Sequence, residues 1–330
     1  MNDNVKKRRI DIDILKTIGI LMVILAHVNP PNIIFQLRNF DVVLLIIVSS
    51  YLGYTTYKNN SYIKYAFKRF ERLIIPTWIF LILFFILSFL LNIENYSFKT
   101  IIDTFILNEG IGYVWVIRIY FLISLLVPLC LVISGKKNKT CIYILTIIIY
   151  VIYELLNTIG IFENHIILYF FGYIIPCFVL IIVSLYLFSA SKKSIFIFSI
   201  LNFILFVLTG LYLYKKTGII QLTNIHKYPF RIYYLSYALM LSSLIILFFK
   251  NEKICKYFNN RFVLFISKNS LWIYLWHILI VTIVNNNNVI WILKYLIVLI
   301  VSLLITYTQS LVISHLEKKC SSRLLKLFKG

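Results

Sequence analysis

Long apolar runs separated by short polar segments recur along the whole chain, and they constrain its fold more than any other feature. A helix needs about 20 apolar residues to cross the hydrocarbon core of a bilayer, and most of the runs are close to that length. They predict ten membrane spans, at residues 12–28, 39–57, 73–92, 113–134, 141–157, 165–188, 194–214, 231–249, 270–284 and 289–313. The ninth run is short for a full span, so we expect this span to start earlier, near Phe262.

The composition agrees with this pattern. Hydrophobic residues make up 61% of the 330 residues, whereas a soluble domain has about 45–50%. We therefore predict an all-α, polytopic integral membrane protein with about ten transmembrane helices in one bundle. We expect residues 1–330 to form a single transmembrane domain, with tails at 1–11 and 314–330.

The formal net charge of +21 is distributed unevenly between two sets of polar segments. With ten spans, both termini lie on one side, and the segments of that side hold 24 of the 33 lysines and arginines, against seven on the other. Because cytoplasmic segments carry the excess of Lys and Arg, we expect cytoplasmic termini and a multi-pass protein of the plasma membrane. The basic surface needs no nucleic-acid partner, since anionic lipid headgroups suffice.

Several common classes of enzyme are not indicated. The sequence has no P-loop, no dinucleotide-binding glycine pattern and no HExxH motif. The five cysteines show neither metal-ligand spacing nor a disulfide framework, so we expect no metal.

The first apolar run carries three ionisable residues, Asp13, Lys16 and His27. At about 100° per helical residue, the step from Lys16 to His27 returns to nearly the same face, about 16 Å further on, and Asp13 lies one turn before Lys16. Ionisable groups inside a span usually line a bundle interior or a wet cavity. Histidine can also take a proton from a hydroxyl near neutral pH. The alternative is that Asp13 and Lys16 mark the cytoplasmic rim and His27 the outer rim.

A second charged motif precedes the third span. Arg69 and Arg72 are three residues apart, so both guanidinium groups project from one helical face, and Pro76 suits the first turn of a span. Planar guanidinium groups bind phosphate in a bidentate manner. The alternative is a positive-inside anchor that contacts lipid headgroups.

Further polar residues that interrupt apolar runs each have a structural and a functional interpretation. Ser49 either allows close helix packing or has a chemical role. Arg118, after Trp115 in the fourth span, either snorkels outward or faces a pore, and Glu154 is either a rim residue or the partner of Arg118. His277 lies in an aromatic-rich span, where histidine is more often a hydrogen-bonded structural residue.

Taken in order, these residues resemble the acyltransferase 3 family of ten-span bacterial membrane acyltransferases. That family opens with a basic residue, ten intervening residues and a histidine, which Lys16 and His27 match, with the acidic Asp13 before them. The later motifs that match are Ile46-Ile47-Val48-Ser49-Ser50-Tyr51, with Ser50 in the place of a glycine, then Arg69 and Arg72 with Pro76, Tyr113-Val114-Trp115, and Ser270 with Tyr274 and His277.

The resemblance implies transfer of an acyl group, most often acetyl from acetyl-CoA, to a hydroxyl of a cell-surface or lipid-linked polysaccharide. His27 would act as the general base, or in an alternative mechanism as an acyl-carrying relay, while Lys16 and Asp13 organise the pore. Arg69 and Arg72 would bind the donor. The residues assigned to the substrate or the pore are Ser49, Trp115, Arg118, Glu154, Tyr274 and His277. The expected partners are the glycan acceptor, acyl-CoA and membrane lipids.

A transporter or flippase for a glycan or a lipid-linked glycan is the alternative from a different class. Intramembrane charge on the first span would then line a translocation path, since transporters place polar groups near the bilayer midplane.

Overall fold

The computed structural model describes residues 8–57, 61–108, 110–136, 139–164, 167–168, 171–285, 289–319 and 325–328, and this part of the chain contains helices and no strand. The shorter helices are α2 (Asn32–Leu37), α5 (Phe98–Phe105), α12 (Glu252–Tyr257), α13 (Arg261–Lys268), η1 (Ile161–Glu163), η2 (Thr223–His226) and η3 (Leu325–Phe328). The longer helices are α1 (Ile10–Ala26), α3 (Asp41–Tyr57), α4 (Tyr62–Leu90), α6 (Trp115–Lys136), α7 (Lys139–Thr158), α9 (Ile174–Ser189), α10 (Lys192–Thr217), α11 (Ile232–Phe249), α14 (Ser270–Asn285) and α15 (Trp291–Lys319). The all-α, polytopic fold class is confirmed.

Each of the ten predicted runs lies on one of the longer helices. By length and composition, seven segments of the described chain can cross a membrane, or eight if the bent pair α13 and α14 counts as one span. α1 and α9 coincide with the first and sixth predicted runs but have only 17 and 16 residues. The number ten therefore stays a prediction, while several membrane-spanning helices are established.

Several predicted boundaries differ from the structure: α4 begins at Tyr62 rather than near residue 73, and α9 begins at Ile174 rather than near residue 165. The segment near Phe262 does not extend the ninth span, because it forms the separate helix α13, which meets α14 at 79°. Asn269 makes the break: its side-chain amide donates to the Phe265 carbonyl at 2.9 Å, and its own carbonyl accepts from Ile273 N at 3.0 Å. At the C-terminal end, α15 runs on to Lys319, so the start of the predicted tail 314–330 is helical. Of the predicted tail 1–11, residues 1–7 lie outside the described part of the chain.

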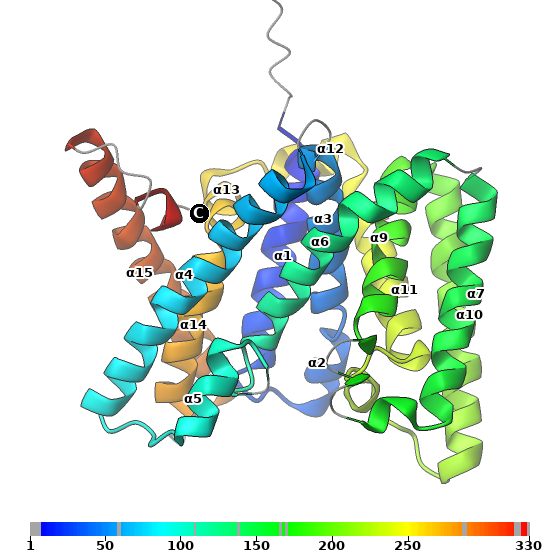
Figure 1. Cartoon of the computed structure of the whole chain (residues 1–330), viewed down its shortest axis with the longest axis horizontal. Coiled ribbons are helices and arrows are strands. Elements are labelled where there is room, and N and C mark those ends of the chain that lie inside the picture. The colour runs from blue at the N-terminus through cyan, green and yellow to red at the C-terminus, as the bar shows by residue number, and fades with distance from the viewer. Residues whose placement is uncertain are drawn as a thin grey trace, which may run out of the picture.

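The helices form a bundle with α1 and α3 near its middle (Figure 1). α4, α14 and α15 lie on one side of this pair, and α7, α9, α10 and α11 on the other. The start of α1, the short helices α12 and α13 and the end of α15 gather at one end of the bundle, whereas α2 and α5 lie toward the opposite end. The start of α1 and the end of α15 therefore lie at the same end of the described bundle.

Close contact between α1 and α3 fixes the position of α1, which carries Asp13 and Lys16. A Cβ atom at Gly19 would collide with the side chain of Leu45, so the absence of a side chain at Gly19 lets the two helices approach. α1 ends at Ala26, and the backbone N–H of His27 donates to the Ile24 carbonyl at 3.1 Å. Pro30 follows shortly and cannot continue a helix. His27 is thereby held at the end of α1, away from the chain termini.

Candidate active site

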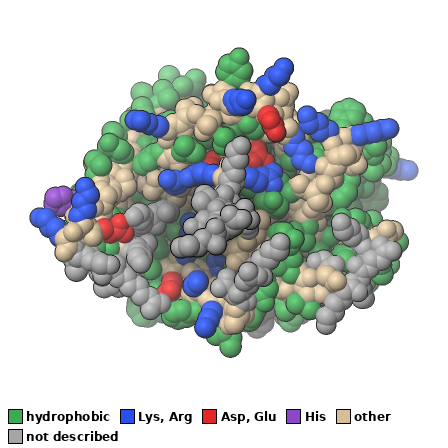
Figure 2. All heavy atoms as spheres, turned by 90° about the horizontal axis from the view of Figure 1, so that it is seen from above, with side chains coloured by type: hydrophobic (Ala, Val, Ile, Leu, Met, Phe, Trp, Pro, Cys, Tyr) green, Lys and Arg blue, Asp and Glu red, His purple; other side chains and the backbone are tan. Residues whose placement is uncertain are grey.

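A cavity of about 1620 Å³ lies between α1, α3, α4, α6 and α14, with the ends of α13 and α15 and the segment η3 at its margin. Its basic residues lie at the end of the bundle where α1 starts, and Figure 2 shows lysine and arginine side chains on that surface. Six basic residues contribute to its lining. They are called the basic rim here and are Lys16, Lys64, Lys68, Arg69, Arg72 and Lys268.

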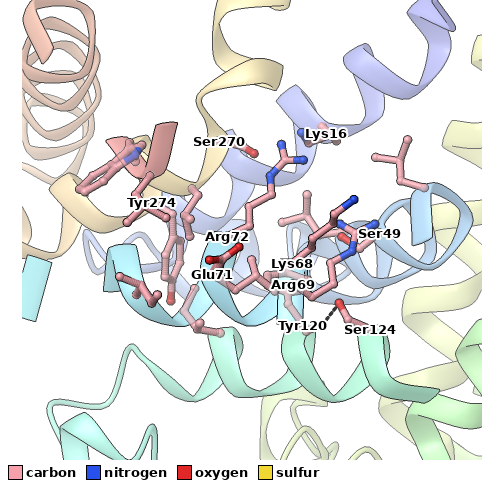
Figure 3. Close-up of a pocket in the computed structure, with 18 of the residues that line it drawn as sticks. Lys16, Ser49, Lys68, Arg69, Glu71, Arg72, Tyr120, Ser124, Ser270 and Tyr274 are labelled. Atoms are coloured by element: carbon pink, nitrogen blue, oxygen red, sulfur yellow. Dashed lines mark hydrogen bonds between the residues drawn. The ribbon is translucent and has the colours of Figure 1, made fainter. Parts of the chain in front are cut away.

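The two predicted arginines both line this cavity (Figure 3). They lie within α4, which begins at Tyr62, well before the predicted third span. Arg69 donates to the Thr56 hydroxyl at 2.6 Å, and its guanidinium lies 5.0 Å from the ring centre of Tyr65. Arg72 is exposed to the cavity. The rim therefore presents guanidinium groups to any anion that enters.

Asp13 and Lys16 are joined through α13 rather than to each other. Asp13 accepts two hydrogen bonds from Arg8, at 2.6 and 2.9 Å, and one from the Ser267 hydroxyl at 2.5 Å. Lys16 Nζ donates to the Ser267 carbonyl at 2.5 Å and also lines the cavity. Although Asp13 lies one turn before Lys16 on the same helix, the ion pair of Asp13 is with Arg8. The reason is that α13 packs against the first turns of α1, so that Ser267 lies between the two charges.

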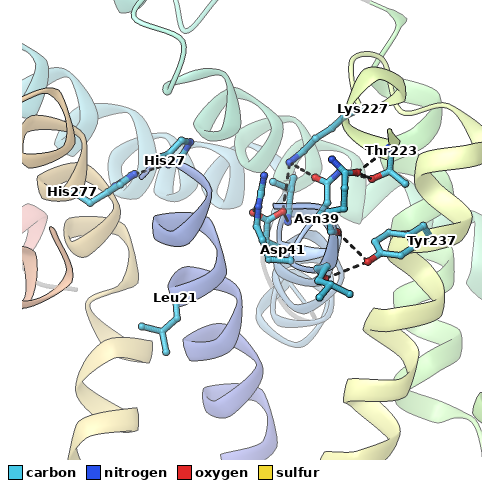
Figure 4. Close-up of polar contacts among 12 residues, drawn as sticks. Leu21, His27, Asn39, Asp41, Thr223, Lys227, Tyr237 and His277 are labelled. Atoms are coloured by element: carbon cyan, nitrogen blue, oxygen red, sulfur yellow. Dashed lines mark hydrogen bonds and ion pairs between the residues drawn. The ribbon is translucent and has the colours of Figure 1, made fainter. Parts of the chain in front are cut away.

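His27 forms a pair with His277 from α14 (Figure 4). His27 Nδ1 lies 3.0 Å from His277 Nε2, and the two rings are stacked with their centres 5.1 Å apart. His277 is fully buried, while His27 is partly exposed. The side-chain amide of Asn285 donates to the His27 carbonyl at 2.9 Å and fixes the backbone of the pair. His277 is thus the neighbour of the predicted base.

The hydrogen bonds of this pair define where its protons are. His277 Nδ1 contacts the carbonyl oxygen of Tyr274, which can only accept, so Nδ1 carries a proton. In a neutral His277, Nε2 is then an acceptor, and His27 Nδ1 must be the donor in the bond between the two rings. This leaves Nε2 of His27 as an unprotonated nitrogen. The arrangement gives His27 the form that a general base requires.

Tyr274 connects the cavity to the histidine pair. Its side chain lines the cavity, its carbonyl holds His277, and its hydroxyl donates to the Tyr113 carbonyl at 2.5 Å. The Tyr113 ring in turn meets His27 edge-on, with ring centres 4.9 Å apart. One residue of α14, Tyr274, therefore contacts both the cavity and His277.

The other predicted residues fall into two groups. Ser49 lines the cavity, as Tyr274 does, whereas the described residues of the lining do not include Trp115, Arg118 or Glu154. Trp115 packs edge-on against Tyr228, with ring centres 4.7 Å apart. Arg118 donates to the Asn108 side chain at 3.2 Å. Trp115 and Arg118 therefore make their contacts outside the described lining of the cavity.

Glu154 has a structural role at the start of α11. Its carboxylate accepts from Arg231 Nε at 2.9 Å and from the backbone N–H of Ile232 at 2.6 Å. The Tyr150 hydroxyl donates to it at 3.3 Å. The ion pair that the structure gives Glu154 is therefore with Arg231, where the sequence suggested Arg118.

A buried group of charges, absent from the sequence-based assignment, lies at the same end of the bundle as the histidine pair (Figure 4). This ion cluster consists of Arg38, Asp41 and Lys227, whose exposed fractions are 3%, 1% and 5%. Arg38 Nη1 donates to Asp41 at 2.7 Å, and Lys227 Nζ lies 3.5 Å from the same carboxylate. Burial lowers the pKa of Lys227 to about 8, although Asp41 opposes the shift.

Polar side chains next to the ion cluster form a hydrogen-bond network that joins two segments of the chain. Lys227 donates to the Asn39 side-chain oxygen at 3.2 Å, and the Asn39 amide donates to the Thr223 hydroxyl at 2.8 Å. Gln36 accepts from both the N–H and the hydroxyl of Thr223, at 3.0 and 2.7 Å. The network ties α2 and the start of α3 to the segment before α11. Its only local signal in the sequence is an aspartate in an apolar run with an arginine three residues before it.

The described part of the chain is thus an all-helical membrane bundle with a basic-rimmed cavity and a histidine pair between α1 and α14. A family model described as an acyltransferase domain, that of the acyltransferase 3 family, matches residues 9–312. The chain belongs to this family and is a membrane acyltransferase, as its motifs suggested. No curated protein and no solved structure matches the chain.

Proposed function

We propose that this membrane acyltransferase transfers an acetyl group from acetyl-CoA to a hydroxyl of a cell-surface or lipid-linked polysaccharide. One observation carries the proposal: a cavity with a basic rim extends to Tyr274, whose carbonyl holds the histidine pair. The described lining of the cavity includes neither His27 nor His277, so Tyr274 is the residue that connects a cavity suited to a phosphate-rich donor with the proposed proton acceptor.

The donor suits the cavity in charge and polarity. The phosphates of acetyl-CoA match the guanidinium groups of Arg69 and Arg72, which bind phosphate oxygens in a bidentate manner. Deeper in the cavity, the lining becomes apolar and suits the uncharged pantetheine arm and the acetyl group. The residues of this deeper part include Ile20, Val23, Leu45, Val116 and Ile117.

The proposed reaction uses His27 as a general base. Nε2 of His27 removes the proton from the acceptor hydroxyl while the oxygen of that hydroxyl attacks the thioester carbonyl carbon. The new C–O bond forms, the C–S bond breaks, and the electron pair of that bond leaves on the sulfur of coenzyme A. The proton then passes from His27 to this sulfur. His277 Nε2 accepts from His27 Nδ1 throughout and stabilises the positive charge that His27 carries briefly.

The basic rim faces the cytoplasm of a bacterial cell in this proposal, and the protein is a multi-pass protein of the plasma membrane. The 24-to-seven distribution of basic residues supports cytoplasmic termini, and the rim lies at the same end of the bundle as the termini. Reporter fusions test this directly. A fusion at Lys193 should report a cytoplasmic location and a fusion at Lys216 the opposite side, and the reverse pattern would refute the orientation.

The test of function compares glycans from matched strains with and without the gene by mass spectrometry. The proposal expects loss of acetyl groups with the amount of glycan unchanged. Loss of the glycan itself would favour the transporter or flippase instead. Strains that express His27→Ala at normal level should resemble the deletion strain in acetyl content.

A further inference from the structure

The cavity contains a buried hydroxyl group whose hydrogen-bonding capacity is unused. The hydroxyl of Tyr120, on α6, is enclosed and has no hydrogen-bond partner among the described residues, although the side chain lines the cavity. Leaving a buried polar group unsatisfied costs about 1–3 kcal/mol. Buried polar groups that remain unpaired are therefore rare, and one in a cavity points to a bound partner.

Three other hydroxyls of the same cavity are already engaged. Ser124 donates to the Tyr120 carbonyl at 2.9 Å, and Thr56 donates to the Leu52 carbonyl at 2.7 Å. The Tyr274 hydroxyl donates to the Tyr113 carbonyl. Tyr120, which lies in the same cavity wall (Figure 3), differs from these three because its O–H has no partner among the described residues.

The place of Tyr120 in the cavity indicates which part of a donor it would meet. Val116 and Ile117, which precede it on α6, belong to the apolar interior, whereas Arg69 and Arg72 belong to the rim. Tyr274, the link to the histidine pair, lines the same interior. In surroundings of low polarity, a single hydrogen bond to an oxygen is stronger than in water. The thioester end of the donor is the part that enters this region.

We propose that the Tyr120 hydroxyl donates a hydrogen bond to the thioester carbonyl oxygen of the donor and stabilises the negative charge that this oxygen gains during transfer. This role rests on the proposed function. As the acceptor oxygen forms its bond to the carbonyl carbon, the carbonyl oxygen becomes an oxyanion held by Tyr120. The oxyanion then collapses, the C–S bond breaks, and the electron pair leaves on sulfur. Tyr120 remains protonated throughout, while His27 carries the transferred proton.

Tyr234 provides a matched control for this proposal. Its hydroxyl is also buried and has no partner among the described residues, but its side chain is not part of the described lining of the cavity. Tyr120→Phe and Tyr234→Phe each remove one unpaired hydroxyl and preserve the ring. A difference between them therefore reports the cavity and not a general effect of losing a phenol.

The first experiment measures the carbonyl band of acetyl-CoA labelled with ¹³C at the carbonyl carbon, bound to the purified full-length protein, by infrared difference spectroscopy. A hydrogen bond to the carbonyl lowers its stretching frequency. We expect the band to move to higher frequency in Tyr120→Phe and to stay in place in Tyr234→Phe. An unchanged band in Tyr120→Phe with bound donor would overturn the role of Tyr120 alone. Failure of the wild-type protein to bind acetyl-CoA would overturn the proposed function and this role with it.

The second experiment measures incorporation of radiolabelled acetyl from acetyl-CoA into glycan by membrane vesicles. Removing one oxyanion donor typically costs about 10²–10³-fold in rate. Tyr120→Phe should show a loss of this size with the KM for acetyl-CoA little changed, and Tyr234→Phe should stay near the wild-type rate. An equal loss in both variants would assign the effect to packing and overturn the proposal.

Discussion

Arg72 at the basic rim and Arg38 in the ion cluster are the same side chain in two different surroundings. Arg72 is exposed to an open cavity, whereas Arg38 is 3% exposed and bonds to Asp41 at 2.7 Å. A charge that faces an open cavity stays hydrated and can exchange water for a ligand. A buried charge is stable only with its partner, so it fixes the elements that supply the pair. The rim is therefore suited to binding an anion, whereas the ion cluster is suited to holding structural elements together.

The largest expected effect is on the rate of acetyl transfer. It comes from His27, which belongs neither to the basic rim nor to the ion cluster. His27→Ala removes the proposed proton acceptor, and one general base is typically worth about 10²–10⁴-fold. Acetyl incorporation by membrane vesicles should fall by this factor while the variant inserts normally. His315→Ala, an exposed histidine on α15, is the control and should keep the wild-type rate. Full activity in a well-expressed His27→Ala protein would refute the role of His27 as base.

The second prediction tests the ion cluster. Asp41→Asn preserves the shape of the side chain but leaves two buried cations without a carboxylate, which should cost about 3–5 kcal/mol in the free energy of unfolding. Chemical denaturation in detergent micelles measures this loss. Glu252→Gln, at an exposed position on α12, should change stability by no more than about 0.5 kcal/mol. Equal stability of the two variants would mean that the cluster does not hold the loops together.

The third prediction concerns pH. The pKa of Lys227 falls from its ordinary 10.5 to about 8 in the folded protein, so the folded state releases its proton earlier than the unfolded chain as pH rises. Between these two values the unfolded state binds more protons, and the free energy of unfolding should therefore increase with pH. The shift corresponds to a gain of about 3 kcal/mol at most. Denaturation curves of the wild type and Lys227→Met should diverge in this window, and parallel curves would contradict the prediction.

The smallest expected effect is at the rim. Arg69→Ala or Arg72→Ala should raise the Kd for acetyl-CoA about tenfold, or about 1.4 kcal/mol, since each arginine is open to water. Isothermal titration with the purified protein measures this change. Lys192→Ala, an exposed basic residue at the same end of the bundle but outside the described cavity lining, is the control. Unchanged donor binding in both arginine variants would make them membrane anchors.

The fold class and several candidate residues were predictable because they depend on local features. A chain with repeated apolar runs can only satisfy its backbone in lipid as helices, so the runs located the helices well. Lys16, His27, Arg69 and Arg72 were found because each is unusual within or beside an apolar run, or shares a helical face with another. The spacing of residues on one helix is fixed by 3.6 residues per turn, and sequence alone reveals it.

Partners on different helices were not predictable in this way. His27 and His277 are 250 residues apart, and Glu154 is 77 residues from Arg231. Nothing in the local pattern of either residue indicates the other, because the packing of whole helices brings them together. The burial of Lys227 beside Asp41 depends on tertiary packing in the same way. The break at Asn269, which turns α13 toward α1 and places Ser267 between two charges, also depends on tertiary contacts.

Tyr274 contacts both the cavity and His277, and this constrains the number of residues between Tyr274 and His277 in α14. The cavity wall and the histidine pair depend on two residues of α14 that are three positions apart, Tyr274 and His277. Each residue added within a helix turns everything beyond it by about 100°. An insertion or deletion between these residues would swing His277 away from His27 while leaving the cavity wall intact. Homologues that share this site should therefore vary in length at the bend before α14 and keep a constant register within it.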